Sequence, residues 1–193
     1  MRICVFAASS DHLEERYLEA AEELGRLLGQ GGHTLIFGGG RTGLMGACAR
    51  GAAQTGAEIV GMMPRFFDEP GVAFERCSRF IWTDNMAERK TRMEEEAEGF
   101  LILPGGIGTM EEFFEVLTQR QIGLHAKPMA LLNTAGYFDA LADFLRRMAD
   151  TGFAGRDVPA LAPLCARPEE ALRALTDAPP AEARRPSKSG YFR

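Results

Sequence analysis

The sequence predicts an α/β fold: a Rossmann-like, doubly wound domain of three layers, with a largely parallel sheet of about seven strands. Two observations predict this class. Short apolar runs alternate along the chain with segments in which apolar residues recur every three or four positions. The short runs are apolar throughout, as in strands that helices cover on both faces. In such folds, ligands bind beyond the carboxyl ends of the strands.

Each element follows from its own stretch of sequence. Apolar runs predict strands over residues 3–8, 34–37, 58–63, 79–83, 100–103 and 128–132, and a short last strand within residues 158–165. Apolar periodicity predicts helices from the polar turn at residues 9–11 to residue 29, and then over residues 44–55, 86–98, about 110–122, 138–148 and 168–175. Residues 65–77 are expected to be irregular, since Pro70 and Gly71 mark a turn.

Composition limits the function classes. The chain has 193 residues, a hydrophobic share of 46% and a net charge of −5, which disfavours binding to nucleic acid polymers and to anionic membranes. We expect one domain over residues 1–176 and a loose tail over residues 177–193, where no apolar period remains. No signal peptide or membrane-spanning stretch is apparent, which predicts a cytoplasmic protein. The scattered cysteines and histidines have no metal-ligand spacing, so no metal and no cofactor is expected.

Two glycine-rich turns follow predicted strands. Residues 104–109 come after the apolar run 100–103 and precede a helical pattern, and residues 38–46 hold the corresponding place after the second strand. The free N–H groups of a helix start and the helix dipole favour an anion, so a phosphate is the expected ligand. Thr109 and Glu112 have the spacing of a capping box, which predicts the start of the helix there.

Other glycine-loop chemistries fit less well. Gly38, Gly40 and Gly43 match the dinucleotide fingerprint, but the next strand ends in Met-Met-Pro and lacks the acid that binds ribose in NAD proteins. Neither turn is followed by the Gly-Lys-Ser/Thr of a P-loop. The strands offer no buried lysine for a pyridoxal phosphate Schiff base. Two tight strand-to-helix turns without a ligand remain the simpler alternative.

Arg89 and Glu112 are the most informative charged residues. Arg89 has no carboxylate partner at helical pairing distance on its own helix, unlike Lys90, which is paired with Glu94. Arg89 is therefore free to hold an external anion, although a solvated surface arginine is the alternative. Glu112 also has an alternative role, since an acid in the first turn of a helix can act only as a cap.

Three segments resemble one known family. Residues 104–112 are similar to the signature Pro-Gly-Gly-x-Gly-Thr-x-x-Glu of the LOG ("Lonely Guy") family, the cytokinin riboside 5′-monophosphate phosphoribohydrolases, formerly labelled possible lysine decarboxylases. Residues 38–46 and 86–90 extend the resemblance, which covers roughly residues 2–175. Two positions depart from the family pattern: Ala8 stands where the family usually has glycine, and Gly71 where many members have glutamate.

The resemblance implies hydrolysis of the N-glycosidic bond of a purine or cytokinin nucleoside 5′-monophosphate, such as AMP, by a homodimer. It implies that Arg89 and Glu112 are catalytic. A non-catalytic nucleotide-binding or carrier protein is the alternative function. Together with the glycine turns, the resemblance predicts these substrate-binding residues: Ser9, Gly39, Gly40, Gly43, Met86, Arg89, Lys90, Gly105, Gly106, Gly108 and Thr109.

Overall fold

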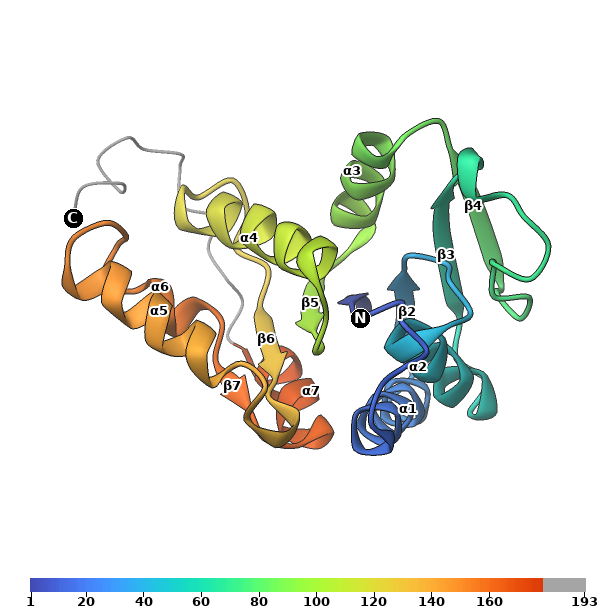
Figure 1. Cartoon of the computed structure of the whole chain (residues 1–193), viewed down its shortest axis with the longest axis horizontal. Coiled ribbons are helices and arrows are strands. Elements are labelled where there is room, and N and C mark those ends of the chain that lie inside the picture. Colours follow the sequence, from blue (N-terminus) through green and yellow to red (C-terminus); the bar gives the residue numbers. More distant parts are fainter. Residues whose placement is uncertain (179–193) are drawn as a thin grey trace.

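A computed structural model describes residues 1–178 of the chain. Its centre is a seven-stranded sheet in which every pair of neighbouring strands is parallel (Figure 1). The strand order is β4-β3-β2-β1-β5-β6-β7. The strands are β1 (Arg2–Phe6), β2 (Thr34–Phe37), β3 (Ile59–Pro64), β4 (Arg79–Thr83), β5 (Gly99–Ile102), β6 (Met129–Leu132) and β7 (Leu164–Cys165).

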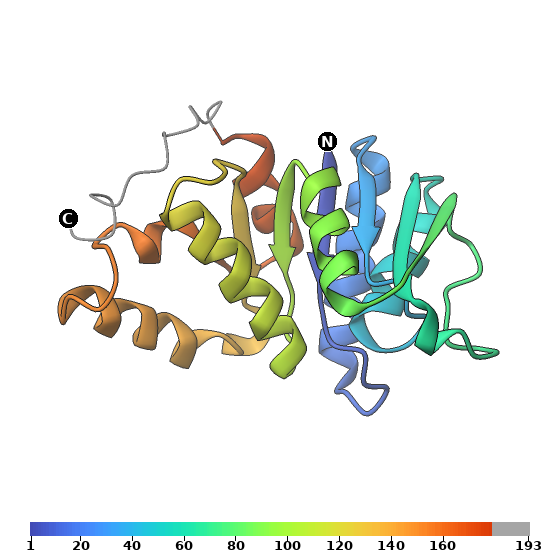
Figure 2. The same ribbon diagram turned by 90° about the horizontal axis from the view of Figure 1, so that it is seen from above.

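Helices cover both faces of the sheet, so the fold has the three layers that the sequence predicts (Figures 1 and 2). One face is covered by α1 (Glu15–Gln30), α2 (Gly43–Gln54) and α7 (Pro168–Thr176). The other is covered by α3 (Met86–Glu96), α4 (Ile107–Gln121), α5 (Asp139–Asp150) and α6 (Val158–Leu161). Two short 3₁₀ turns, η1 (Arg65–Phe67) and η2 (Thr134–Gly136), complete the chain order.

Each face of the sheet has its own hydrophobic core. Successive residues of a strand point to opposite faces, so Ile3 and Val5 pack against α1 and α2, whereas Cys4 and Phe6 pack beneath α3 and α4. Because both faces are covered, β1, β2 and β5 read as continuous apolar runs.

The sheet order reverses between β1 and β5. From β1 the chain builds outward through β2, β3 and β4, and then returns to the other side of β1 with β5. The loops that follow these two strands are joined, because the N–H of Ala8 donates to the carbonyl oxygen of Pro104 at 3.2 Å and the N–H of Leu103 donates to that of Phe6 at 2.9 Å. A reversal point of this kind forms a crevice where ligands bind.

The structure confirms the predicted fold class and corrects several element boundaries. Residues 158–161 form the helix α6 and only Leu164–Cys165 form a strand, so the predicted strand was largely wrong. The first helix begins at Glu15 rather than at residues 9–11, which form a loop. Helix α4 begins at Ile107, one turn earlier than predicted. The predicted tail lies outside the described residues from residue 179 onward. Within the described residues, no helix has the length and apolar character needed to cross a membrane.

Candidate active site

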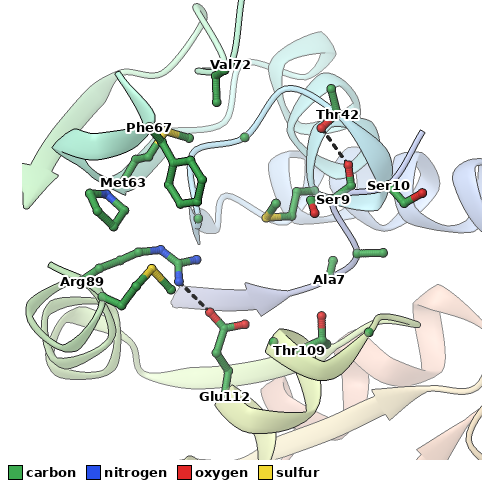
Figure 3. A pocket seen from close by; sticks show the side chains of 18 of the residues that line it. Ala7, Ser9, Ser10, Thr42, Met63, Phe67, Val72, Arg89, Thr109 and Glu112 are labelled. Atoms are coloured by element: carbon green, nitrogen blue, oxygen red, sulfur yellow. Dashed lines mark hydrogen bonds and ion pairs between the residues drawn. The ribbon is translucent and has the colours of Figure 1, made fainter. Parts of the chain in front are cut away.

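A cavity of about 620 Å³ opens at the carboxyl ends of the strands (Figure 3). Its walls come from the loop after β1, the glycine turn after β2, the end of β3 with the segment that follows it, and the starts of α3 and α4. This volume is in the range of small-molecule sites. The cavity therefore occupies the crevice that the reversal of strand order predicts.

The start of α4 offers free hydrogen-bond donors to this cavity. Gly106 is the N-cap residue, and the first intrahelical bond runs from Met110 N–H to the carbonyl oxygen of Gly106 at 3.1 Å. Among the described residues, no acceptor faces the N–H groups of Ile107, Gly108 and Thr109. The hydroxyl of Tyr137 holds the turn from outside by donating to the Gly105 carbonyl oxygen at 2.7 Å. Three unpaired N–H groups at a positive helix end form a site for an anion.

The start of α2 differs, because the chain satisfies two of its first three N–H groups internally. Gly43 N–H donates to a carboxylate oxygen of Asp11 at 3.0 Å, and Met45 N–H donates to the Ala8 carbonyl oxygen at 3.2 Å. Gly43 has a φ of +59°, and a β-carbon there would lie 2.5 Å from the Ala8 carbonyl oxygen. Glycine is therefore required for this contact, and the second glycine turn forms a wall of the cavity rather than a second free anion site.

Arg89 and Glu112 form a buried ion pair at the floor of the cavity (Figure 3). Nη1 of Arg89 lies 2.9 Å from Oε1 of Glu112, and each side chain is about a tenth exposed. The prediction that Arg89 lacks an internal partner was correct for its own helix but wrong for the fold, because Glu112 approaches from α4. The predicted capping box was also wrong: α4 begins before Thr109, and the Glu112 side chain turns to Arg89.

Burial and charge have opposite effects on Glu112. Burial raises the pKa of the Glu112 carboxyl above its usual value of 4.5, and the neighbouring Arg89 guanidinium partly offsets this effect by lowering it. The net effect is a raised pKa of the Glu112 carboxyl. The carboxylate is thus less stable than an exposed one, as is common for groups that exchange protons in catalysis.

Several elements hold Arg89 in position. The Asn85 side chain accepts a hydrogen bond from Glu88 N–H at 2.9 Å and so caps the start of α3. Nε of Arg89 donates to the Met62 carbonyl oxygen of β3 at 3.1 Å. A β-carbon at Gly38 would lie 2.3 Å from Nη2 of Arg89, so glycine at that position leaves room for the guanidinium. The arginine is fixed before any ligand binds.

The predicted site residues divide into two groups. Eight line the cavity: Ser9, Gly40, Met86, Arg89, Gly106, Gly108, Thr109 and Glu112. Four do not: Gly39, Gly43, Gly105 and Lys90. The three glycines shape the two turns. Lys90 lies in ion pairs with Glu111 and Glu115 of α4, so its predicted pairing with Glu94 on its own helix was wrong. These pairs join α3 to α4 next to the cavity, and their hydrogen bonds raise the pKa of the Lys90 ammonium.

The sequence analysis missed other lining residues. Some lie within two positions of predicted residues on the same turns, so their turns were recognised although they were not: Ala7, Ala8, Ser10, Gly38, Thr42, Ile107 and Glu111. The rest come from α2, from the end of β3 and from the irregular segment that follows it, where no periodic pattern marks a site: Met45, Met63, Pro64, Phe67, Gly71 and Val72. Both departures from the family pattern, Ala8 and Gly71, are among the lining residues. Residues 1–178 contain no group of three or more His, Cys, Asp or Glu side chains able to hold a metal ion.

Comparisons with known proteins identify relatives of this chain. The family model described as "Possible lysine decarboxylase" matches residues 45–175. The Arabidopsis thaliana protein named cytokinin riboside 5′-monophosphate phosphoribohydrolase LOG2 is 38% identical over 152 residues, which is 79% of this chain and 71% of the relative. The Oryza sativa protein named probable cytokinin riboside 5′-monophosphate phosphoribohydrolase LOGL2 is 34% identical over 182 residues, which is 93% of this chain and 73% of the relative.

Solved structures of lower identity share the fold. The molybdenum cofactor carrier protein from Chlamydomonas reinhardtii aligns with a TM-score of 0.70 at 23% identity, over 91% of this chain and 95% of that chain. The molybdenum cofactor binding protein from Rippkaea orientalis aligns with a TM-score of 0.70 at 20% identity, over 91% of this chain and 96% of that chain. At these identities the likeness establishes the fold alone. The family model and the two plant relatives together establish that the chain belongs to the LOG family of phosphoribohydrolases.

Proposed function

We propose that the protein hydrolyses the N-glycosidic bond of a purine nucleoside 5′-monophosphate, AMP or an N6-substituted relative of cytokinin type. The products are the free base and ribose 5-phosphate. One observation carries the proposal: the buried Glu112–Arg89 pair lies about one helical turn along α4 from three free N–H groups. A 5′-phosphate held by those N–H groups brings its ribose toward Glu112.

The binding mode follows from the walls of the cavity. The phosphate occupies the start of α4, where Gly106 and Gly108 leave the backbone uncovered and the helix dipole favours negative charge. Ser9 and Ser10 line the same cavity from the loop after β1 and offer hydroxyl groups. These local donors overcome the repulsion expected from a chain whose net charge is −5.

The chemistry assigned to Glu112 is that of a carboxylate beside a developing positive charge. When the bond between C1′ and the base nitrogen breaks, the bonding electrons leave with the base and the ribose becomes oxocarbenium-like. The Glu112 carboxylate stabilises that charge and accepts a proton from the water that attacks C1′. The departing base takes a proton from solvent in place of the broken bond, and Glu112 later releases the proton of the attacking water to solvent, so one water is consumed in each turnover. The raised pKa of Glu112 suits an acceptor of this kind.

Arg89 keeps Glu112 ready for this role. Its guanidinium favours the ionised carboxylate and fixes its position, while the hydrogen bond to Met62 fixes the arginine. The remaining guanidinium donors can reach a ribose hydroxyl or a phosphate oxygen in the cavity. Both side chains therefore belong to one unit, and removing either should impair turnover.

We also propose that the active form is a homodimer, as the family resemblance implies. The apolar side chains Phe113, Val116 and Leu117 of α4 lend the dimer no support, because they pack inside their own subunit. Support comes instead from the mouth of the cavity. Ile107 at the start of α4 is 88% exposed and Met86 at the start of α3 is 41% exposed. Exposed apolar side chains beside a site are suited to contact with a second copy of the chain.

Incubation of the purified protein with AMP, followed by chromatography, tests the proposed reaction. We expect adenine and ribose 5-phosphate in equal amounts, and release that is about a hundredfold or more slower with the Glu112→Gln variant. Tight binding of AMP without products would reject the hydrolase and favour the alternative, a nucleotide carrier. Release of phosphate instead of base would show that the N-glycosidic bond is not the bond that is cleaved.

A further inference from the structure

Phe67 is an aromatic residue that lines the cavity and remains partly exposed. It lies at the end of the 3₁₀ turn η1, directly after β3, and the residue is 47% exposed. Figure 3 shows the ring projecting into the cavity above Arg89, on the side away from Glu112 and Thr109. Among the described lining residues it is the only aromatic one.

The lining residues divide the cavity into a polar end and an apolar end. Ser9, Ser10 and Thr109 stand with the free N–H groups at the polar end. Met63 and Pro64 at the end of β3 stand with Phe67 and Val72 at the other (Figure 3). The Arg89–Glu112 pair lies below Phe67 in Figure 3, with Glu112 on the side of Thr109. A nucleotide whose phosphate occupies the polar end can extend its base to the apolar end.

The segment that carries Phe67 is held by backbone hydrogen bonds. Asp68 N–H donates to the Arg65 carbonyl oxygen at 3.0 Å, and Glu69 N–H donates to that of Phe67 at 2.8 Å. Val72 then accepts from Arg41 N–H at 3.0 Å, which ties the segment to the second glycine turn. The Phe66 ring contacts Phe67, with ring centroids 4.5 Å apart, but Phe66 does not line the cavity. Phe67 is thus presented to the cavity in an ordered backbone.

We propose that Phe67 stacks on the base of the bound nucleotide and makes the cavity select purines over pyrimidines. The proposal rests on the proposed function for the position of the phosphate and ribose. Stacking requires only a flat π-face, and a two-ring purine covers more of the phenyl ring than a one-ring pyrimidine does. Phe67 touches the substrate in this scheme but takes no part in bond breaking.

Calorimetric measurement of the affinities of three ligands distinguishes a contact between Phe67 and the base from a general disturbance of the cavity. AMP carries phosphate, ribose and purine; cytidine 5′-monophosphate carries a pyrimidine; ribose 5-phosphate carries no base. All measurements use the Glu112→Gln background so that AMP is not consumed. Phe67→Ala should weaken AMP binding about tenfold, and Phe67→Tyr should retain it. Ribose 5-phosphate should bind Phe67→Ala as it binds the background protein, and the preference for AMP over cytidine 5′-monophosphate should shrink.

Phe66→Ala is the matched control, since Phe66 precedes Phe67 on the same turn and is 60% exposed. Because the Phe66 ring contacts Phe67 but does not line the cavity, Phe66→Ala should weaken AMP binding far less than Phe67→Ala does and should leave ribose 5-phosphate binding unchanged. Unchanged AMP affinity in Phe67→Ala would overturn the proposal, and so would an equal loss for AMP and ribose 5-phosphate, which would indicate a structural role. A background protein that does not bind AMP would overturn it as well. AMP binding that depends on Phe67 in a protein that releases no base would reject the hydrolase and leave the stacking contact standing.

Discussion

Glu112 and Arg89 lie on different helices, 23 positions apart in the chain, yet each buried charge is stable only because the other faces it. At the scale of residues, sequence spacing identified Arg89 and Glu112 as candidate site residues, but it could not show that they form an ion pair with each other. The helix around Arg89 lacks a partner for it, and Glu112 has the spacing of a cap. Only the packing of α3 beside α4 brings the two together.

Glu112→Gln should lower the rate of base release by about a hundredfold or more, the scale of a lost acid–base group. The parent should lose activity as pH falls through the Glu112 pKa, because only the carboxylate accepts the proton. Since burial raises that pKa above 4.5, the acid limb should lie above 4.5. Rates of adenine release from pH 4 to 8 measure both effects. Near-parent turnover in Glu112→Gln would remove Glu112 from the mechanism.

Arg89→Met should destabilise the protein in a pH-dependent way. Without Arg89, the pKa of Glu112 rises further, because the guanidinium is what lowers it. A buried carboxyl with a raised pKa favours the folded state at low pH and loses that contribution as pH rises through its folded pKa. The cost of an unpaired buried charge, about 3–5 kcal/mol, should therefore be largest near pH 8 and smaller near pH 5.

Thermal unfolding of parent and Arg89→Met across this pH range gives the measurement. The matched control is the double variant Arg89→Met/Glu112→Gln, which removes the titrating group. Its stability should depend on pH much less than that of Arg89→Met. A Tm difference that stays constant from pH 5 to pH 8 would indicate that Glu112 is not the group responsible.

At the scale of elements, strands were easier to predict than helix starts. The strands Thr34–Phe37 and Arg79–Thr83 have the predicted bounds, because each contains three consecutive large apolar residues between polar or glycine segments. The start of α4 was placed late because Thr109 and Glu112 satisfy a local capping pattern, which the glycine turn and the contact with Arg89 override. The cavity wall after β3 could not be predicted, since an irregular segment has no period.

The glycine at the start of α4 gives the element-scale prediction. A β-carbon at Gly106 would meet no atom within 4 Å, so larger residues fit without disturbing the fold. Because Gly106 lines the cavity, a side chain there should cover the N–H groups that hold the phosphate. Gly106→Ala should weaken AMP binding and Gly106→Val should weaken it further, with melting temperatures lowered by only a few degrees. Calorimetry and thermal unfolding measure the two effects, and parent-like AMP affinity in Gly106→Val would place the phosphate elsewhere.

At the scale of the whole molecule, the parallel order β4-β3-β2-β1-β5-β6-β7 accounts for the position of the cavity. Alternating strands and helices predicted the fold class, because a parallel strand can be reached only by a crossover connection. The strand order itself cannot be predicted from the local periodicity of the sequence. It depends on which strands meet in the core, yet it determines that the loops after β1 and β5 converge. The sequence therefore predicted loops at the carboxyl edge of the sheet. The contact between the loops after β1 and β5 follows only from the strand order.

The proposed homodimer predicts a mass of twice 21.1 kDa by light scattering at micromolar concentration. If the mouth of the cavity forms the interface, Ile107→Lys should shift the mass toward the monomer, because a charge would be buried between the subunits. Phe153→Lys is a matched control: Phe153 is 87% exposed, against 88% for Ile107, and does not line the cavity. It should leave the dimer intact. A monomeric parent would reject the dimer, and dissociation by Phe153→Lys alone would move the interface away from the cavity to the end of α5.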